Sequence, residues 1–278
     1  MSTQQTITGE LRRWIQDHAQ AGTARATILQ SMCASGWSQS VALQALAETL
    51  DGASPELPPP SPVPEPDLRG APAEIQLSDR RVQVLLRVEH PRVVVFGGLL
   101  SHEECDAMVA AATRRLARSE TVANDKDGSE VNAARTSEGM FFERAENEVC
   151  ARVEARIAEL LHWPVENGEG LQVLHYRAGA EYLPHYDYFD PAHASTPAIL
   201  ARGGQRVGTL VMYLNTPEQG GSTVFPDIKL DVAPIKGNAV FFSYERAHPS
   251  TLTLHGGSPV LAGEKWVATK WMREREFI

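Results

Sequence analysis

The chain has 278 residues, of which 42% are hydrophobic and 22% are charged, and its formal net charge is -9. These proportions are ordinary for a soluble globular protein, and the length accommodates one large domain with a small appendage. The negative balance argues against a nucleic-acid-binding protein, and the lack of an apolar run of about 18 residues argues against a membrane span.

The amino terminus shows no basic start followed by an apolar block, so we expect no secretory signal. Three cysteines, Cys33, Cys105 and Cys150, are odd in number, widely spaced and outside any C-x-x-C pattern. This usage indicates free thiols in a reducing compartment. The sequence therefore favours a cytoplasmic location.

Residues 1–52 carry apolar side chains at helical spacing, in three groups separated by Gly22 and Gly36. The pattern predicts a three-helix bundle close to the lower size limit for independent folding. Its layout is faintly similar to that of ubiquitin-associated-type domains, without a specific motif. The sequence does not identify a partner for this small domain.

Residues 53–72 read as a linker. Seven prolines fall between Pro55 and Pro66, including the run Pro58-Pro59-Pro60. Such a composition favours extended polyproline II and predicts a semi-rigid spacer between the helical bundle and a larger domain over residues 73–278.

The larger domain is predicted to be mainly β with supporting helices. One helix begins after Ser101, with Glu104 at the capping-box position, and a second covers about 145–161. From Gly170 onward the chain shows eight short strand-like segments separated by Gly and Pro turns: 171–176, 182–188, 208–214, 222–225, 230–232, 238–243, 252–256 and 266–271. The number and spacing favour a double-sheet jelly roll, the double-stranded β-helix or cupin architecture, although periodicity alone does not separate it from another sandwich.

His185 and Asp187 form an H-x-D pair in one of these segments, and His255 lies in another. Residues i and i+2 of a strand point to the same side, so the pair can reach one metal ion. Two imidazoles and a carboxylate suit Fe(II) and leave three coordination positions open. Taken singly, each residue could equally be a polar strand-end residue or a hydrogen-bonded core histidine.

Three further features occur in order around this pattern: Tyr176, the run Gly220–Pro226 and the closing segment Gly263–Trp271. Together with the H-x-D pair, they resemble the collagen-type prolyl 4-hydroxylase family of iron- and 2-oxoglutarate-dependent dioxygenases. The resemblance covers about residues 90–275. It implies Fe(II), 2-oxoglutarate and O2 as cofactors, ascorbate as reductant, and the jelly-roll fold.

The resemblance also implies a cosubstrate site. Lys265 matches the residue that holds the far carboxylate of 2-oxoglutarate, with hydroxyls from Tyr176 and Thr223 beside it. An ammonium can meet a carboxylate inside a barrel if the pair is shielded and supplemented by hydrogen bonds. The alternatives are a solvated strand-end lysine at Lys265, comparable with Lys270, and a simple strand-filling role for Thr223.

Four residues match family positions on the substrate side: Arg135, Ser137, Arg206 and Trp271. The first two belong to an Arg-Thr-Ser segment that follows a polar loop, and the last two border the substrate channel. Arg135 could instead be a surface ion-pair residue, Arg206 an exposed strand-edge charge and Trp271 a core residue.

The function implied by the resemblance is hydroxylation of an unactivated C–H bond, most simply C4 of a prolyl residue in a peptide or protein, with release of succinate and CO2. No protein general base is expected, because the cofactor carries the difficult step. Three alternatives stay open at this stage: a hydroxylase of a free amino acid or other small molecule, a Zn(II)-dependent hydrolase or isomerase on the same barrel, and a non-catalytic peptide-binding barrel.

Overall fold

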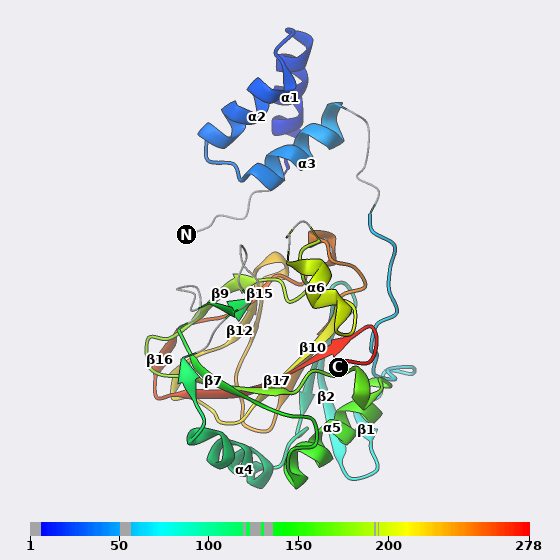
Figure 1. Ribbon diagram of the computed structural model, residues 1–278, viewed down its shortest axis with the longest axis vertical. Helices are drawn as coiled ribbons and strands as arrows, with labels where there is room; N and C mark the ends of the chain where they lie inside the picture. The colour runs from blue at the N-terminus through cyan, green and yellow to red at the C-terminus, as the bar shows by residue number, and fades with distance from the viewer. Residues whose placement is uncertain are drawn as a thin grey trace. The chain divides into compact units, whose positions relative to one another are not determined.

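A computed structural model of the chain describes residues 7–50, 57–118, 121–122, 129–130, 136–191, 193 and 195–278 (Figure 1). The chain divides into two compact units, Met1–Pro59 and Pro60–Ile278. The boundary falls inside the segment predicted to be a linker. Within the described ranges, no helix is both long and apolar enough to cross a membrane.

The first unit is a bundle of three helices, α1 (Gly9–Gln20), α2 (Arg25–Ala34) and α3 (Gln39–Leu50). Thr8 caps α1 by accepting a hydrogen bond from the Leu11 backbone N–H. A small buried core joins the three helices and consists of Ile15, Ile28, Met32, Ala42, Ala45 and Leu46.

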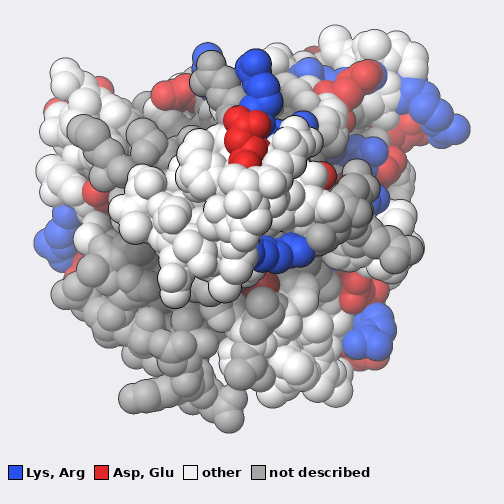
Figure 2. All heavy atoms as spheres, turned by 90° about the horizontal axis from the view of Figure 1, so that it is seen from above, with Lys and Arg blue, Asp and Glu red and all other residues white. Residues whose placement is uncertain are grey.

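Figure 2 shows one face of the molecule, on which the Lys, Arg, Asp and Glu side chains lie scattered among uncharged ones.

The second unit is built on two antiparallel sheets, in agreement with the predicted jelly roll. The nine-stranded sheet has the order β1-β2-β3-β14-β10-β17-β8-β7-β4, and the four-stranded sheet has the order β13-β12-β15-β9. The first sheet consists of β1 (Glu74–Gln76), β2 (Arg81–Val88), β3 (Arg92–Gly97), β4 (Ala117–Arg118), β7 (Glu138–Phe142), β8 (Leu171–Tyr176), β10 (Arg206–Tyr213), β14 (Ala239–Ser243) and β17 (Lys265–Arg273). The second consists of β9 (Tyr182–His185), β12 (Thr223–Phe225), β13 (Leu230–Val232) and β15 (His255–Gly257).

Shorter elements complete this unit. Two strand pairs stand apart from the main sheets: β5 (Thr121–Val122) with β6 (Ser129–Glu130), and β11 (Gln219–Gly220) with β16 (Val260–Ala262). Three single turns of 3₁₀-helix cover Val165–Asn167, Pro226–Ile228 and Pro249–Thr251, and a short helix α6 covers Thr196–Ala201.

The nine-stranded sheet is packed on both faces. On one face it meets the four-stranded sheet through a core that includes Tyr213, Phe242 and Phe225. On the other face lie the helices α4 (His102–Thr113) and α5 (Glu148–Leu161), the two supporting helices that the sequence predicted. We call these the inner and the outer face. Cys105 and Cys150 lie in the outer core, and burial raises the pKa of both thiols to about 11, which makes them unreactive.

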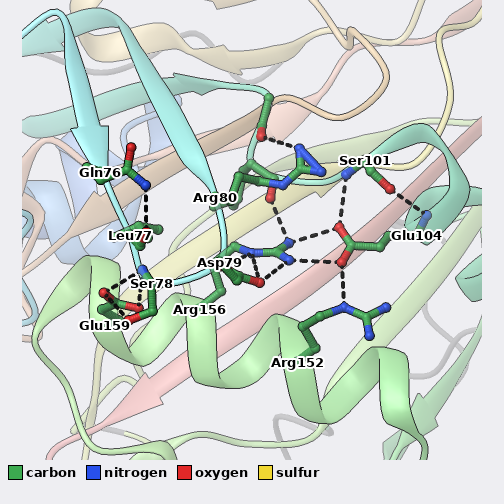
Figure 3. Close-up of polar contacts among 12 residues, drawn as sticks. Gln76, Leu77, Ser78, Asp79, Arg80, Ser101, Glu104, Arg152, Arg156 and Glu159 are labelled. Carbon is green, nitrogen blue, oxygen red and sulfur yellow. Dashed lines mark hydrogen bonds and ion pairs between the residues drawn. The ribbon is translucent and has the colours of Figure 1, made fainter.

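A buried ion-pair cluster holds the outer helices together (Figure 3). Arg156 of α5 donates to Glu104 of α4 and to Asp79, which lies in the turn between β1 and β2. Glu104 also accepts from Arg152 and from the Ser101 backbone, where it completes the predicted capping box. Each charge in this cluster has an opposite charge beside it, and this pairing offsets the free-energy cost of removing the ions from water.

The second half of the predicted linker is fixed to the second unit. The Ser61 backbone N–H donates to the Glu245 carbonyl at 2.7 Å, and the Ser61 hydroxyl donates to the Glu274 carboxylate at 2.7 Å. Pro64 and Pro66 are buried. Residues 51–56 of the predicted spacer lie outside the described residues. From Ser61 onward the prediction of a spacer is wrong, because the chain there is extended and packs against the sheet domain.

Candidate active site

Three predicted metal ligands come together where two strands of the four-stranded sheet pair. His185 ends β9, His255 begins β15, and the two residues are register partners. The predicted strand over 182–188 ends at His185, so Asp187 follows in a bend instead of sharing the strand. Asp187 Oδ1 lies 3.5 Å from His185 Nε2, and its Oδ2 lies 3.5 Å from His255 Nε2.

The geometry of these three side chains fits one metal ion. Their ligand atoms all lie within 4.8 Å of one another. Metal–nitrogen and metal–oxygen bonds of about 2.0–2.2 Å can therefore converge on one point between them with small side-chain adjustments. Within the described part of the chain, no other group of three or more His, Cys, Asp or Glu residues has this arrangement.

The backbone orients both imidazoles. His185 Nδ1 lies 2.9 Å from the Leu183 carbonyl, and His255 Nδ1 lies 3.0 Å from the Thr253 carbonyl. A carbonyl oxygen can only accept, so each Nδ1 carries the proton. The Nε2 lone pairs then face Asp187, which is the tautomer that a metal-binding histidine needs.

The charges at the site also suit a metal ion. Burial raises the pKa of Asp187, but the neighbouring His255 and His185 rings and the Arg206 guanidinium outweigh burial and hold this pKa well below its usual range. Burial lowers the pKa of His255 to about 4. The result is an ionised carboxylate beside neutral imidazole, the ligand chemistry that Fe(II) accepts with three positions left open.

Lys265, the first residue of β17, is a buried cation that forms no ion pair with any described residue. Its side chain is 4% exposed, and it makes no hydrogen bond or ion pair with any residue that the structure describes. Its Nζ lies 5.5 Å from the ring centroid of Tyr176 and 5.9 Å from that of Tyr213. Burial lowers the pKa of Lys265 to about 8. A carboxylate ligand would supply the missing charge partner.

Two glycines place this ammonium near the metal ligands. Lys265 Nζ lies 3.7 Å from the point where a Cβ on Gly257 would stand, and the Lys265 side chain passes 3.2 Å from the same point on Gly221, whose φ is +74°. Gly257 follows His255 by two strand residues, which is about 7 Å. The Lys265 ammonium thus lies beside the strand that carries His255, two residues beyond this ligand.

Thr223 completes the predicted cosubstrate group. It pairs with Gly257 across the sheet, and its Oγ1 accepts a hydrogen bond of 2.9 Å from the Tyr213 hydroxyl. Tyr176 is the register partner of Lys265. The structure thus brings Lys265, Tyr176 and Thr223 together beside β15, the strand that carries the metal ligand His255.

The four predicted substrate residues have different outcomes. Arg135 lies outside the described residues. Ser137 is buried (1% exposed) next to Thr136, whose backbone N–H donates to the Glu181 carbonyl just before β9. Ser137 therefore lies beside the strand that carries His185. A substrate role for these residues stays a prediction.

Arg206 and Trp271 lie together beside the metal site. The Arg206 guanidinium stacks 3.9 Å from the Trp271 ring centroid, and its Nη1 lies 3.5 Å from the Asp187 carbonyl. Glu169 accepts two hydrogen bonds from Arg206, at 2.7 and 2.8 Å. Arg206 is therefore part of an ion pair next to the site, and the alternative of an exposed strand-edge charge does not apply.

Sequence reasoning missed several polar residues around the site. Thr209 donates a hydrogen bond to Asp187, Tyr244 contacts Thr209, Tyr213 contacts Thr223, and Glu169 pairs with Arg206. The sequence offers one signal for such residues, namely a polar side chain at an inward-facing position of an otherwise apolar strand. Their partners lie 10 to 37 residues away, and no spacing rule identifies them.

Comparisons with known proteins agree with this geometry. A model of the 2OG-Fe(II) oxygenase superfamily matches residues 171–273. Two Arabidopsis thaliana proteins, a probable prolyl 4-hydroxylase 7 and prolyl 4-hydroxylase 5, are each 39% identical over 209 residues. The match covers 67% of this chain in both cases, and 64% of the first relative and 70% of the second.

A solved structure shows the same fold. The viral collagen prolyl hydroxylase of Paramecium Bursaria Chlorella virus-1, crystallised as a 2OG complex, superposes with a TM-score of 0.52 and 31% sequence identity. The match covers 65% of this chain and 95% of the viral chain. With the triad and the buried lysine in place, these matches show that the chain is a 2-oxoglutarate-dependent dioxygenase and belongs to the prolyl 4-hydroxylase family of the 2OG-Fe(II) oxygenase superfamily.

Proposed function

We propose that this chain hydroxylates C4 of prolyl residues in a peptide or protein, with conversion of 2-oxoglutarate and O2 to succinate and CO2. The observation that carries the proposal is the combination of the metal triad with Lys265, a buried ammonium beside Gly257 of β15 that has no hydrogen-bond or ion-pair partner among the described residues. The names of its relatives support proline as the target.

The residues of this chain have separable tasks in the proposed reaction. His185, Asp187 and His255 would hold Fe(II), which supplies oxygen activation when bound. Lys265 would bind the C5 carboxylate of 2-oxoglutarate, and Tyr176 and Thr223 would shape the same end of the pocket. Trp271 and Arg206 would border the substrate channel, and Ser137 would be a further residue on the substrate side. Ascorbate would serve as the reductant that maintains ferrous iron.

A zinc hydrolase on the same barrel is a poorer fit. Hydrolysis does not require a keto-diacid, so a zinc hydrolase would not explain why the ammonium of Lys265 is buried. An unpaired buried charge costs stability, and a site that retains one is expected to use it.

The proposal is tested by incubating the full chain with Fe(II), 2-oxoglutarate, ascorbate and O2 in the presence of proline-rich peptides, unfolded proteins or free proline. Succinate and a product mass increase of one oxygen atom are measured together. We expect both to rise with the proline-containing peptides. Product formed from free proline and not from peptides would instead identify a small-molecule hydroxylase, and no succinate under any condition would indicate a non-catalytic barrel.

A further inference from the structure

Thr209 is a buried hydroxyl in the interior of the nine-stranded sheet. It lies on β10, where its register partners are Phe242 on β14 and Trp271 on β17, and its exposed fraction is 0%. A hydroxyl in such surroundings is costly unless it is hydrogen-bonded. It has two partners: Asp187 Oδ2 at 2.7 Å and the Tyr244 hydroxyl at 2.9 Å.

The direction of these two hydrogen bonds follows from the chemistry of the groups. An ionised carboxylate accepts and cannot donate, so the single proton of Thr209 goes to Asp187. The Thr209 oxygen must then accept from Tyr244, whose side chain is also buried (1% exposed). The order is therefore Tyr244 to Thr209 to Asp187, and the last of these bonds is strengthened by the charge of the carboxylate.

This chain of hydrogen bonds distinguishes the two oxygens of Asp187. Oδ2 carries the Thr209 bond, whereas Oδ1, 3.5 Å from His185 Nε2, has no such bond from a described hydroxyl. A metal ion bound through one carboxylate oxygen and two imidazoles has three octahedral positions left. Binding through both oxygens would use one of them, and a two-oxygen chelator plus O2 needs all three.

We propose that Thr209 and Tyr244 are positioning residues of the metal centre, which hold the Asp187 carboxylate so that it binds the metal through Oδ1 alone. Neither residue needs to touch the substrate, because both act through Asp187. The inference does not depend on which substrate the enzyme uses. It requires only that the triad bind a divalent metal ion.

Three variants of the full chain test this inference with Mn(II) as the metal probe, titrated by calorimetry. Thr209→Val removes the hydroxyl and keeps the branched shape, Thr209→Ser keeps the hydroxyl, and Tyr244→Phe removes only the outer donor. We expect Mn(II) affinity to fall about 10- to 100-fold in Thr209→Val, to stay close to the wild-type value in Thr209→Ser, and to fall less in Tyr244→Phe, as for other groups that orient metal ligands.

A second measurement separates positioning from general loosening of the fold. Under anaerobic conditions and saturating Fe(II), chelation of a 2-keto acid gives a visible charge-transfer absorption, which can be titrated with 2-oxoglutarate. If Asp187 of Thr209→Val takes up a second metal position, this titration shifts to higher 2-oxoglutarate concentration even though iron is saturating. Thermal melting of each apo variant checks that it is folded.

Several outcomes would overturn the inference. A folded Thr209→Val variant that binds Mn(II) as tightly as the wild type refutes it, and so does a Thr209→Ser variant as weak as Thr209→Val. If Thr209→Val does not fold, an unchanged Mn(II) affinity in Tyr244→Phe is decisive against it. A wild-type chain that binds no Mn(II) would refute the metal site itself, which is a different failure from loss of peptide hydroxylation.

Discussion

Two lysines on one strand, Lys265 and Lys270 of β17, are almost equally buried, with exposed fractions of 4% and 3%. Because they are five residues apart, they point to opposite faces of the sheet. Lys270 points to the outer face, where its Nζ pairs with the Glu154 carboxylate of α5 and donates to the Glu169 carbonyl. Lys265 points to the inner face and has no such partner among the described residues.

The difference between the two faces separates structural charge from functional charge. On the outer face, Lys270 and the Arg156 cluster are satisfied by the protein itself, so these ions fasten helices to the sheet. On the inner face, Lys265 has no hydrogen-bond or ion-pair partner among the described residues, and the ligand atoms of His185, Asp187 and His255 lie within 4.8 Å of one another. A buried charge that the fold leaves unpaired indicates a ligand site.

The largest test of this distinction is to remove an inner-face ligand. Asp187→Ala should reduce 2-oxoglutarate turnover by about 10³-fold or more, equivalent to roughly 4 kcal/mol, because two imidazoles alone do not retain the metal. The protein should stay folded, since the cores on both faces are untouched. Succinate formation and thermal melting measure the two effects, and His248→Ala, a histidine outside the triad, is the matched control.

The outer face should respond in the opposite way. Lys270→Met leaves the Glu154 carboxylate buried (1% exposed side chain) without its partner. Such a change should lower the free energy of unfolding by about 3–5 kcal/mol, while affinity for 2-oxoglutarate in the protein that remains folded should be unchanged. Urea unfolding followed by circular dichroism measures the loss. A stable variant with weakened cosubstrate binding would reverse the assignment of the two lysines.

The matched variant on the inner face is Lys265→Met. We expect its KM for 2-oxoglutarate to rise by about 100-fold, or roughly 2.7 kcal/mol, because the C5 carboxylate loses the cation that Lys265 supplies. The apo protein should be more stable than wild type, since burial lowers the pKa of Lys265 from 10.5 to about 8, which corresponds to a cost of roughly 3 kcal/mol at neutral pH. Steady-state kinetics should therefore show weaker binding of 2-oxoglutarate, while urea unfolding should show a larger free energy of unfolding.

The contrast between the two lysines could be predicted only in part from the sequence. Short motifs and the resemblance to the prolyl 4-hydroxylase family predict the jelly roll, the H-x-D pair, His255 and Lys265. The interpretation of Lys270 as a solvated strand-end lysine is wrong, because Lys270 is 3% exposed and pairs with Glu154. The sequence does not indicate this pair, since the two residues lie 116 positions apart.

Other features depend in the same way on how distant segments pack. The hydrogen bond from Thr209 to Asp187 spans 22 residues, and the attachment of Ser61 to Glu274 spans 213. Strand periodicity shows that Thr209 points inward but says nothing about which side chain it meets. Contacts of this kind are set by the packed sheet, and for that reason the support of the metal ligands was visible only in the structure.

The smallest expected effect is the contribution of Lys265 to the pH dependence of stability and of cosubstrate binding. A lysine with a folded-state pKa of about 8 and an ordinary value of 10.5 binds more protons in the unfolded chain across this interval, so Lys265 should add stability to the apo protein as pH rises from about 8 to 10.5. Above about pH 9 the thiols of Cys105 and Cys150 act in the opposite sense, because burial raises their pKa to about 11. Over the same range the ammonium is lost, and the KM for 2-oxoglutarate should rise about tenfold between pH 7 and pH 9. Lys265→Met should lose the slope in KM and should not gain stability between pH 8 and pH 9, whereas Lys270→Met should keep the slope in KM. A wild-type KM that stays flat to pH 9 would mean that the cation is not the group that holds the cosubstrate.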